Sequence, residues 1–478
     1  MQHSTWFLAN ENVRLGVLVV LLCACALLGG TARADVVHLV VLRPIGVLCA
    51  FYALLVATRE ELRTVRAPLF ILLALMTVVG LQLVPLPSIV WSGLPTHAGQ
   101  AVIDAQTGVG EVWRPISLDP DATASAFFAL FVPLAALVLA AGQGRRGRSL
   151  VIGSLMLLAV IGGMLGLLQM FSGSSRLFYI YPVTNFGSPV GFLANRNHQA
   201  VFMAAMVALA GAQLARLKLE RNEASRTRPL AWLVIFLALP VVLASESRAG
   251  IVALAIAAMT AGYMLISSGT IPRRVPIARR RSVSGPWLLS LVALAFVAVS
   301  GFLFIVLSGS SPAELSGMTD QTYDLRFEVL PIAMRMAGDA MPLGIGAGAF
   351  PLVFRAYEPV AMVEPRYLNH AHNDWVQPFI ELGVPGALVL VAFVVWLAAW
   401  AIRLGRSNPD NAFFAQLGLW FVIVILVLAS GVDYPLRTPL LMAVAATCAG
   451  LLGQDWRKAK PSHGPRSADP APPPEEFA

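Results

Sequence analysis

Charged side chains are scarce in this sequence. Asp, Glu, Lys and Arg make up 13% of its 478 residues, apolar residues make up 57%, and the mean hydropathy is +0.73. A water-soluble domain needs more polar side chains than this to cover its exterior. The composition therefore excludes a soluble enzyme or soluble binding domain and indicates a membrane protein.

Cysteine and histidine are rare as well, with four and seven residues respectively. All four cysteines, Cys23, Cys25, Cys49 and Cys448, fall inside apolar runs, where a thiol packs as a small apolar side chain. This placement excludes a disulfide framework and a cysteine-based metal site.

Long apolar runs, in contrast, recur along the whole chain. A helix needs about 20 consecutive apolar residues to cross a bilayer, and the runs are continuous, whereas the strands of a membrane barrel alternate. The sequence therefore predicts an all-α, polytopic helical membrane protein with about twelve transmembrane helices. The predicted spans are 13–30, 36–57, 68–86, 123–142, 150–171, 192–215, 229–244, 249–268, 286–308, 383–404, 412–430 and 436–453.

The basic residues predict how these helices are oriented. With twelve spans both ends of the chain lie on one side, and the segments on that side hold 22 of the 34 Lys and Arg residues, against nine on the other side. The positive-inside rule then places both termini in the cytoplasm. The basic residues are scattered over short loops without stacking aromatics, so we expect no nucleic-acid partner.

This topology divides the chain into four parts. Residues 1–308 hold nine transmembrane helices, and we expect the first of these to be retained. Residues 309–382 form a large periplasmic loop, which we expect to contain short helices. Residues 383–453 hold the last three spans, and 454–478 form a Pro-rich, disordered cytoplasmic tail.

Three arginines stand on or near the predicted outer face, each within a polar stretch. Arg196 lies in "GFLANRNHQA", Arg248 in "SESRAG" and Arg326 in "YDLRFEVLPIAM". An arginine beside hydrocarbon usually faces a cavity or a partner. For Arg248 the sequence leaves two interpretations open: an ion pair with Glu246, or a fixed positive charge that binds an anionic head group through its planar fork.

The stretch "NHAHNDW" at 369–375 concentrates polar side chains on the same face. His370, His372 and Asp374 alternate, so they could ligate a metal from an extended backbone. They could equally cap a helix that starts near Asn373. A third interpretation is one neutral histidine that acts as a general base.

The glycine-rich stretch "GIGAGAF" at 344–350 lacks the spacing of a dinucleotide fingerprint. It is more typical of a tight turn in which one backbone segment approaches another closely.

Together these motifs resemble the O-antigen ligase and polymerase superfamily. The resemblance rests on His372–Asn373 followed by nine residues and then Gly383, on "ESRAG" and "DLRFEVLPIAM", and on the Asn-x-Asn of "GFLANRNHQA". It covers roughly residues 160–390 and implies a fold similar to the GT-C membrane glycosyltransferases.

The resemblance also implies an activity and a set of roles. Members of the superfamily transfer a glycan from undecaprenyl diphosphate to an acceptor hydroxyl on the periplasmic face, without a metal, ATP or another cofactor. His372 would be the catalytic base, and Arg248, Arg326 and Arg196 would bind the diphosphate. The supporting residues would be Asn373, His370, Asp374 and Asn197.

The sequence leaves the substrates partly open. The acceptor would be a lipid A core sugar in a ligase and the growing glycan in an O-antigen or exopolysaccharide polymerase, and membrane lipid surrounds either enzyme. A transporter of lipid-linked glycans is the competing interpretation from another class. The absence of repeated halves and the histidine-bearing outer loop favour catalysis.

Overall fold

The computed structural model describes residues 10–172, 176–222, 225–270, 321–363, 367–454 and 456, with the side chains of 270 and 321–327 left aside. Within these ranges the chain folds into helices joined by loops, with one isolated β-bridge between Leu86 and Arg114. This confirms the predicted all-α, polytopic membrane fold. The longer helices are α2 (Glu11–Leu28), α3 (His38–Val56), α5 (Arg66–Leu81), α8 (Pro120–Ala129), α9 (Phe131–Ala141), α10 (Arg145–Phe171), α11 (Arg196–Glu220), α12 (Thr227–Ala244), α13 (Arg248–Thr270), α16 (Gln321–Asp339), α18 (Gln377–Gly405), α19 (Asn411–Ala429) and α20 (Pro439–Leu452).

Eleven of the twelve predicted spans coincide with helices, with α8 and α9 together forming the fourth, and the span predicted at 286–308 lies outside the described residues. In the described part of the chain, nine helical stretches are long and apolar enough to cross a membrane. Helices α5 and α20 are apolar but have only 16 and 14 residues. Prolines explain these bounds, since Pro85 and Pro87 follow α5, and α20 begins at Pro439.

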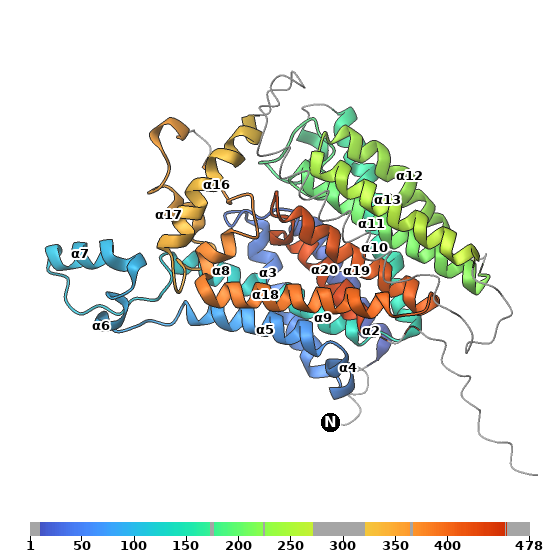
Figure 1. Ribbon diagram of the computed structural model, residues 1–478, viewed down its shortest axis with the longest axis horizontal. Helices are drawn as coiled ribbons and strands as arrows, with labels where there is room; N and C mark the ends of the chain where they lie inside the picture. Colours follow the sequence, from blue (N-terminus) through green and yellow to red (C-terminus); the bar gives the residue numbers. More distant parts are fainter. Residues whose placement is uncertain are drawn as a thin grey trace, which may run out of the picture.

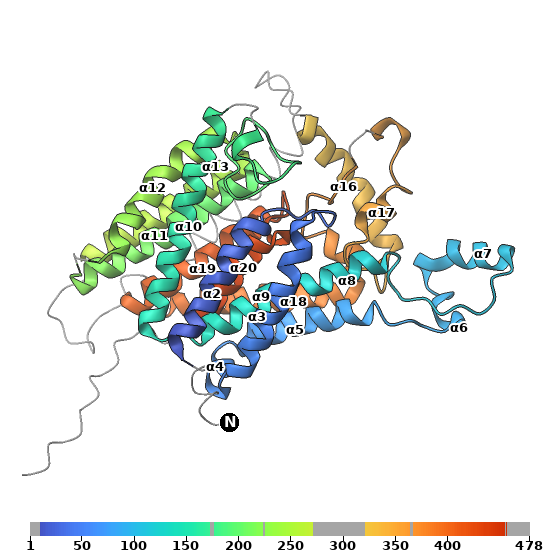
Figure 2. The same ribbon diagram turned by 180° about the vertical axis from the view of Figure 1, so that it is seen from behind.

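Helices α11, α12 and α13 lie side by side, and α5, α8, α9 and α18 run at an angle to them (Figures 1 and 2). Helices α11 and α19 are buried along almost their whole length, so they form the centre of the molecule.

Small residues allow these central helices to approach each other closely. A Cβ atom added at Gly211 of α11 would lie 2.4 Å from Ala261 of α13, and one at Gly418 of α19 would lie 2.3 Å from Ala212 of α11. Such glycine and alanine contacts are typical of membrane helices, where packing replaces the hydrophobic effect as the driving force for association.

Several loops and short helices gather at one end of the bundle, which we call the His372 end. Helices α6 (Ser88–Trp91) and α7 (Ala98–Thr107) project away from the body, with the 3-10 turn η1 (Pro95–His97) between them, and α16 packs beside α17 (Phe350–Phe354) (Figure 1). The turns η2 (Arg176–Phe178), η4 (Val360–Met362) and η5 (Pro435–Arg437) complete this end, while α4 (Arg59–Thr64) lies at the opposite end. Val329 and Ala333 of α16 are buried in a separate small core.

The "GIGAGAF" stretch is the tight turn that its sequence predicted. Gly344, Gly346 and Gly348 all have positive φ angles, between +78° and +104°. A Cβ at Gly344 would lie 2.3 Å from the carbonyl oxygen of Glu381, so this turn packs directly against the start of α18. The turn therefore connects the segment after α16 directly to the start of α18.

Candidate functional site

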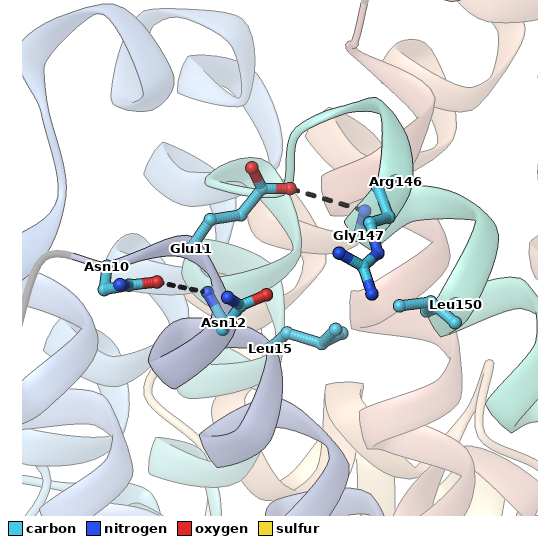
Figure 3. Close-up of a pocket in the computed structure, with 7 residues that line it drawn as sticks. All are labelled: Asn10, Glu11, Asn12, Leu15, Arg146, Gly147 and Leu150. Carbon is cyan, nitrogen blue, oxygen red and sulfur yellow. Dashed lines mark hydrogen bonds between the residues drawn. The ribbon is translucent and has the colours of Figure 1, made fainter.

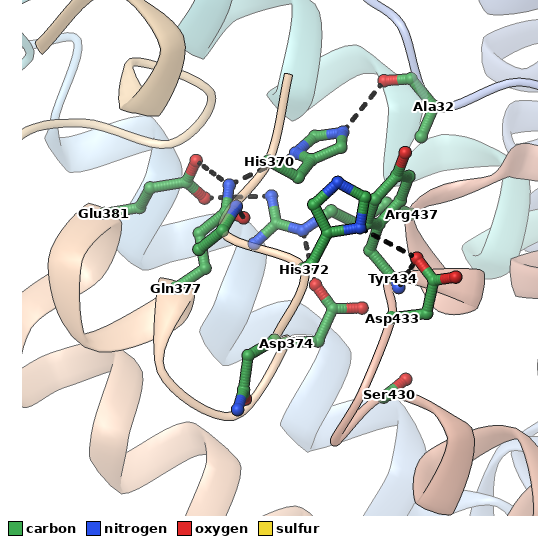
Figure 4. A network of polar contacts seen from close by, with 12 residues as sticks. Ala32, His370, His372, Asp374, Gln377, Glu381, Ser430, Asp433, Tyr434 and Arg437 are labelled. Carbon is green, nitrogen blue, oxygen red and sulfur yellow. Dashed lines mark hydrogen bonds and ion pairs between the residues drawn. The ribbon is translucent and has the colours of Figure 1, made fainter. Parts of the chain in front are cut away.

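His372 lies in the loop before α18 and adopts a backbone conformation that is unusual for a residue with a side chain. Its φ is +52°, in the left-handed region that asparagine and glycine prefer. Its Nδ1 atom is buried and lies 3.4 Å from Oδ1 of Asp433, whereas the side chain as a whole is 21% exposed. The accessible nitrogen of the ring is therefore Nε2 (Figure 4).

Asp433 connects this loop with the start of α11. Its side chain is only 3% exposed, and its Oδ2 atom accepts a hydrogen bond of 3.0 Å from Nδ2 of Asn197. The Nε2 atom of His198 lies 3.5 Å from the same oxygen that faces His372. Because a buried carboxylate needs donors around it, these groups keep Asp433 in place against His372.

Tyr434 provides a common surface for three histidines. The ring centroids of His370, His372 and His198 lie 4.4, 4.9 and 5.1 Å from the centroid of Tyr434. The contacts are tilted or edge-to-face, the geometry that aromatic rings prefer. A single residue after α19 thus holds histidines from two distant segments together.

His370 has a structural role in this arrangement. Its Nδ1 atom lies 3.3 Å from the amide nitrogen of Gln377, which donates, so Nε2 carries the proton and donates to the carbonyl oxygen of Ala32 at 3.3 Å. Burial, together with the nearby Arg437, lowers the pKa of His370 well below its ordinary value. His370 is therefore neutral and fully engaged, which leaves His372 as the accessible imidazole.

Arg437 anchors the loop and the start of α18 from below the histidines (Figure 4). Its Nε atom donates to Asp374 at 2.6 Å, and its Nη1 atom donates to Glu381 at 3.0 Å. These two carboxylates raise the pKa of Arg437, while burial raises the pKa of Asp374 to about 6 despite the attraction of Arg437. Gln377 completes the network by donating to Glu381 at 2.7 Å.

Of the three predicted diphosphate-binding arginines, Arg196 and Arg248 begin the helices α11 and α13. Arg196 lies next to Asn197 in the chain, and its Nη1 atom is 3.3 Å from Oε2 of Glu246. Glu246 thus contacts Arg196. The sequence had suggested Glu246 only as a partner for Arg248. Arg326 belongs to α16, but its side chain lies outside the described residues.

Gly383 of the histidine motif forms a break inside α18. Its backbone has φ +60° and ψ −146°, so the helix is kinked at this position. A Cβ atom there would lie 2.2 Å from the carbonyl oxygen of Pro342. Only glycine satisfies both conditions, which explains why the motif requires this residue type.

A comparison with protein-family models matches residues 233–391 to the family described as O-antigen ligase. We call this stretch, which is similar to the O-antigen ligase family, the O-antigen ligase domain. No curated protein matches the chain with significance. The resemblance deduced from the motifs is confirmed at the level of this superfamily, whose members are membrane glycosyltransferase-type enzymes.

The O-antigen ligase domain does not contain the whole constellation around His372. The match includes Arg248, Arg326 and the "NHAHNDW" loop, but Asn197 precedes it, and Asp433 and Arg437 follow it. The sequence analysis missed Asp433, Tyr434, Arg437, Gln377 and Glu381. The only signal for the first three was "VDYPLR", an acidic and a basic residue between two apolar runs.

The structure shows which groups the alternating side chains of the loop contact. His370 binds Ala32 and Gln377, Asp374 turns to Arg437, and Asn373 accepts from the amides of Trp375 and Val376 at 2.9 and 3.2 Å. In the part of the chain that the structure describes, no three His, Cys, Asp or Glu side chains are arranged to hold a metal ion. Asn373 stabilises the turn before α18 and does not cap the helix itself, which has Val376 at its N-cap.

A surface cleft of about 300 Å³ lies far from this constellation (Figure 3). It is lined by the residues at the start of α2 and α10, and the amide of Gly147 donates to Glu11 across it at 3.3 Å. Since Ala32 follows the other end of α2, the cleft and His372 lie at opposite ends of the bundle. It therefore has no part in the candidate site.

Proposed function

We propose that this protein is a glycosyltransferase that works on the periplasmic face of the bacterial inner membrane. It moves a glycan from undecaprenyl diphosphate to an acceptor hydroxyl, in the manner of an O-antigen ligase with a lipid A core acceptor. The observation that carries this proposal is the pairing of a partly exposed His372 with the buried carboxylate of Asp433 in a chain with an O-antigen ligase domain.

His372 acts as the general base in this proposal. A proton on Nδ1 faces Asp433, so the lone pair of Nε2 points to the accessible side and can take the proton of the acceptor hydroxyl. The acceptor oxygen then forms a bond to the anomeric carbon of the donor sugar. The bond between that carbon and the diphosphate oxygen breaks, and its electron pair leaves with undecaprenyl diphosphate.

The diphosphate gains negative charge in this step, and positively charged side chains that are already in position stabilise that charge. Arg248 and Arg326 would bind its oxygens, and Arg196, at the start of α11, would add a third positive charge. A charge-assisted hydrogen bond contributes roughly 1.5–3 kcal/mol. Because the diphosphate is already an activated leaving group, we expect transfer to proceed without ATP and to persist when a chelator such as EDTA is added.

A purified donor and acceptor assay tests the role of His372. We expect His372→Ala to lower the turnover rate by about 10²–10⁴-fold, the usual contribution of a positioned base, while binding of the lipid-linked donor is retained. Asp433→Asn keeps the size of the side chain and an acceptor for Asn197, so it should lower turnover less. Melting temperatures within a few degrees of the wild type would show that both variants fold. Unchanged turnover of the His372→Ala protein would refute the proposal.

The glycan phenotype of a deletion strain identifies the acceptor. A ligase predicts that all polymer is lost from the lipid A core. A single repeat unit left on the core would instead indicate a polymerase, and loss of a secreted polysaccharide alone would indicate an exopolysaccharide polymerase.

A further inference from the structure

A polar cluster of four side chains lies beside the histidine loop, on the surface of the His372 end. Arg33 donates from Nε and Nη2 to the two carboxylate oxygens of Asp35, at 3.1 and 2.8 Å. The hydroxyl of Tyr367 accepts from Arg33 at 2.9 Å and donates to Asp35 at 3.3 Å. The guanidinium of Arg355 lies 5.9 Å from the centroid of the same tyrosine ring. We call these residues the Tyr367 cluster.

The cluster is open to solvent. Tyr367 is 39% exposed, the side chain of Asp35 is 56% exposed, and Arg355 lies on the surface. The hydrogen bond between Arg33 and Asp35 raises the pKa of the arginine and lowers that of the acid, so both remain charged at neutral pH. An aromatic ring is thus presented with a carboxylate and two guanidinium groups around it.

The loop that carries Arg33 and Asp35 is held rigidly in place. The amide of Gly30 donates to the hydroxyl of Tyr181 at 2.7 Å, and its carbonyl oxygen accepts from the amide of Ala194 at 2.9 Å. The carbonyl oxygen of Gly29 accepts from the amide of Leu440 at 3.0 Å. Two neighbouring glycines therefore fix the loop to two other parts of the fold, so a ligand would meet a preorganised surface.

The contacts also relate the cluster to the proposed base. Arg33 directly follows Ala32, whose carbonyl oxygen binds His370, and Tyr367 precedes His370 by three residues. His370 and His372 share the ring of Tyr434. The start of α11, which carries Arg196, contacts Asp433 through Asn197 and also lies beside the loop of the cluster, since the amide of Ala194 donates to Gly30. The contacts therefore connect the Tyr367 cluster both with the proposed base and with the start of α11.

The chemistry of the cluster suits a sugar ring. A sugar presents apolar C–H faces that pack on an aromatic ring and hydroxyl groups that both donate and accept hydrogen bonds. Tyr367 is 39% exposed, and the guanidinium groups of Arg33 and Arg355 lie 5.0 and 5.9 Å from its ring centroid. A sugar would pack on the part of the ring that these groups leave open, the carboxylate of Asp35 would accept a hydrogen bond, and the two arginines would donate.

We propose that the Tyr367 cluster is a subsite for the acceptor glycan. This inference rests on the proposed transferase function and names the surface that positions the acceptor sugar for His372. Its occupant is a sugar ring of the acceptor, bound by stacking on Tyr367 and by hydrogen bonds to Arg33, Asp35 and Arg355.

Steady-state kinetics with purified protein test the subsite. The probes are purified lipid A–core lipopolysaccharide without O-antigen as acceptor and undecaprenyl diphosphate-linked O-antigen as donor. We expect Tyr367→Ala to raise the acceptor KM about tenfold or more, with the donor KM and kcat changed less than twofold. Arg355→Ala, which removes no hydrogen bond within the cluster, should raise the acceptor KM by a smaller factor. An unchanged acceptor KM in both variants would overturn the subsite.

A second tyrosine provides a matched control. Tyr357 also lies near an arginine, with Arg335 5.5 Å from its ring centroid, and its hydroxyl donates to Asp339 at 3.0 Å. It packs against the separate core of α16 and α17. Tyr357→Ala should therefore leave the acceptor KM within twofold of the wild-type value. An equal increase in both tyrosine variants would show a general disturbance of the loop and overturn the subsite.

Direct binding separates this proposal from the function on which it rests. The His372→Ala protein should turn over its substrates slowly, so its affinity for the same lipid A–core acceptor can be measured by titration in the absence of donor. We expect the added Tyr367→Ala change to weaken this affinity at least fivefold. If Tyr367→Ala weakens acceptor binding but the wild-type protein transfers no glycan, only the transferase function is refuted. If the wild-type protein transfers the glycan but Tyr367→Ala leaves the acceptor affinity unchanged, only the subsite is refuted.

Discussion

Asp374 is a buried carboxyl group that shares the guanidinium of Arg437 with Glu381. One arginine cannot balance both of these acids and the nearby Asp433, and burial raises the pKa of Asp374 to about 6. Because the folded pKa lies above the ordinary value of 3.8, this carboxyl stabilises the folded state most below about pH 4. That contribution is lost as the pH rises through 6.

We therefore expect Asp374→Asn to reduce the dependence of stability on pH. The asparagine oxygen can still accept from Arg437, and Glu381 remains to balance the charge of the arginine. As the pH rises from 4 to 6, the melting temperature of the wild type should fall relative to that of the variant. Glu111→Gln, at an exposed site, is the control and should follow the wild-type curve. Parallel curves for wild type and Asp374→Asn would contradict the raised pKa.

The sequence indicated part of this site and missed the rest, for a physical reason. His372, Asn373 and Gly383 lie within one short motif, so their association can be read from spacing alone. Asp433 and Arg437 follow α19 and meet the motif only because that helix returns the chain to the same end of the bundle. A single pair of opposite charges between two apolar runs has too little local pattern to reveal such a contact.

At the scale of elements, α18 is predicted well in position but not in shape. The apolar run predicted a span at 383–404, whereas the helix begins at Gln377 and is kinked at Gly383. The cause is tertiary, since the turn at 344–346 lies against the carbonyl groups of Ile380 and Glu381 and accepts no bulkier backbone neighbour there. Hydrophobic periodicity reports which residues face lipid or core, and it carries no information on such backbone contacts.

Gly383→Ala tests this element. The new Cβ would lie 2.2 Å from the carbonyl oxygen of Pro342 in a backbone conformation that strains any side chain. We expect a loss of stability of more than about 4 kcal/mol, in the range of severe core defects, seen as a low yield of folded protein in detergent. Gly262→Ala in α13 has open space around its Cβ and should change stability by less than about 1 kcal/mol. Similar yields for the two variants would contradict the account of the kink.

At the scale of the whole molecule, the positions of the helices follow from composition, whereas their orientation remains a prediction of the positive-inside rule. The contacts do fix which loops share an end. The side-chain amide of Gln82, after α5, donates to the carbonyl oxygen of Glu381 at 2.8 Å. The segment that follows α5 is therefore at the His372 end, and the loop between α18 and α19 lies at the opposite end.

Reporter fusions test this orientation. Alkaline phosphatase, which is active only in the periplasm, should be active when fused after Gly108, in the projecting loop beyond α7, because the His372 end is predicted to face outward. The same enzyme fused after Asn408 should be inactive, since the loop between α18 and α19 is predicted to be cytoplasmic. The reverse pattern of activity would place His372 in the cytoplasm and remove the proposed substrate from its reach.

The double attachment at Gly29 and Gly30 has a consequence for engineering. These residues connect the end of α2 to the start of α20 and to the segment before α11, and all three lie outside the stretch that matches the O-antigen ligase model. A chimera that exchanges only residues 233–391 between two such proteins would transplant the histidine while leaving its surroundings behind. To transfer specificity, the recipient should also receive the connection between its first two helices and the segment between its last two helices, which carries Asp433 and Arg437.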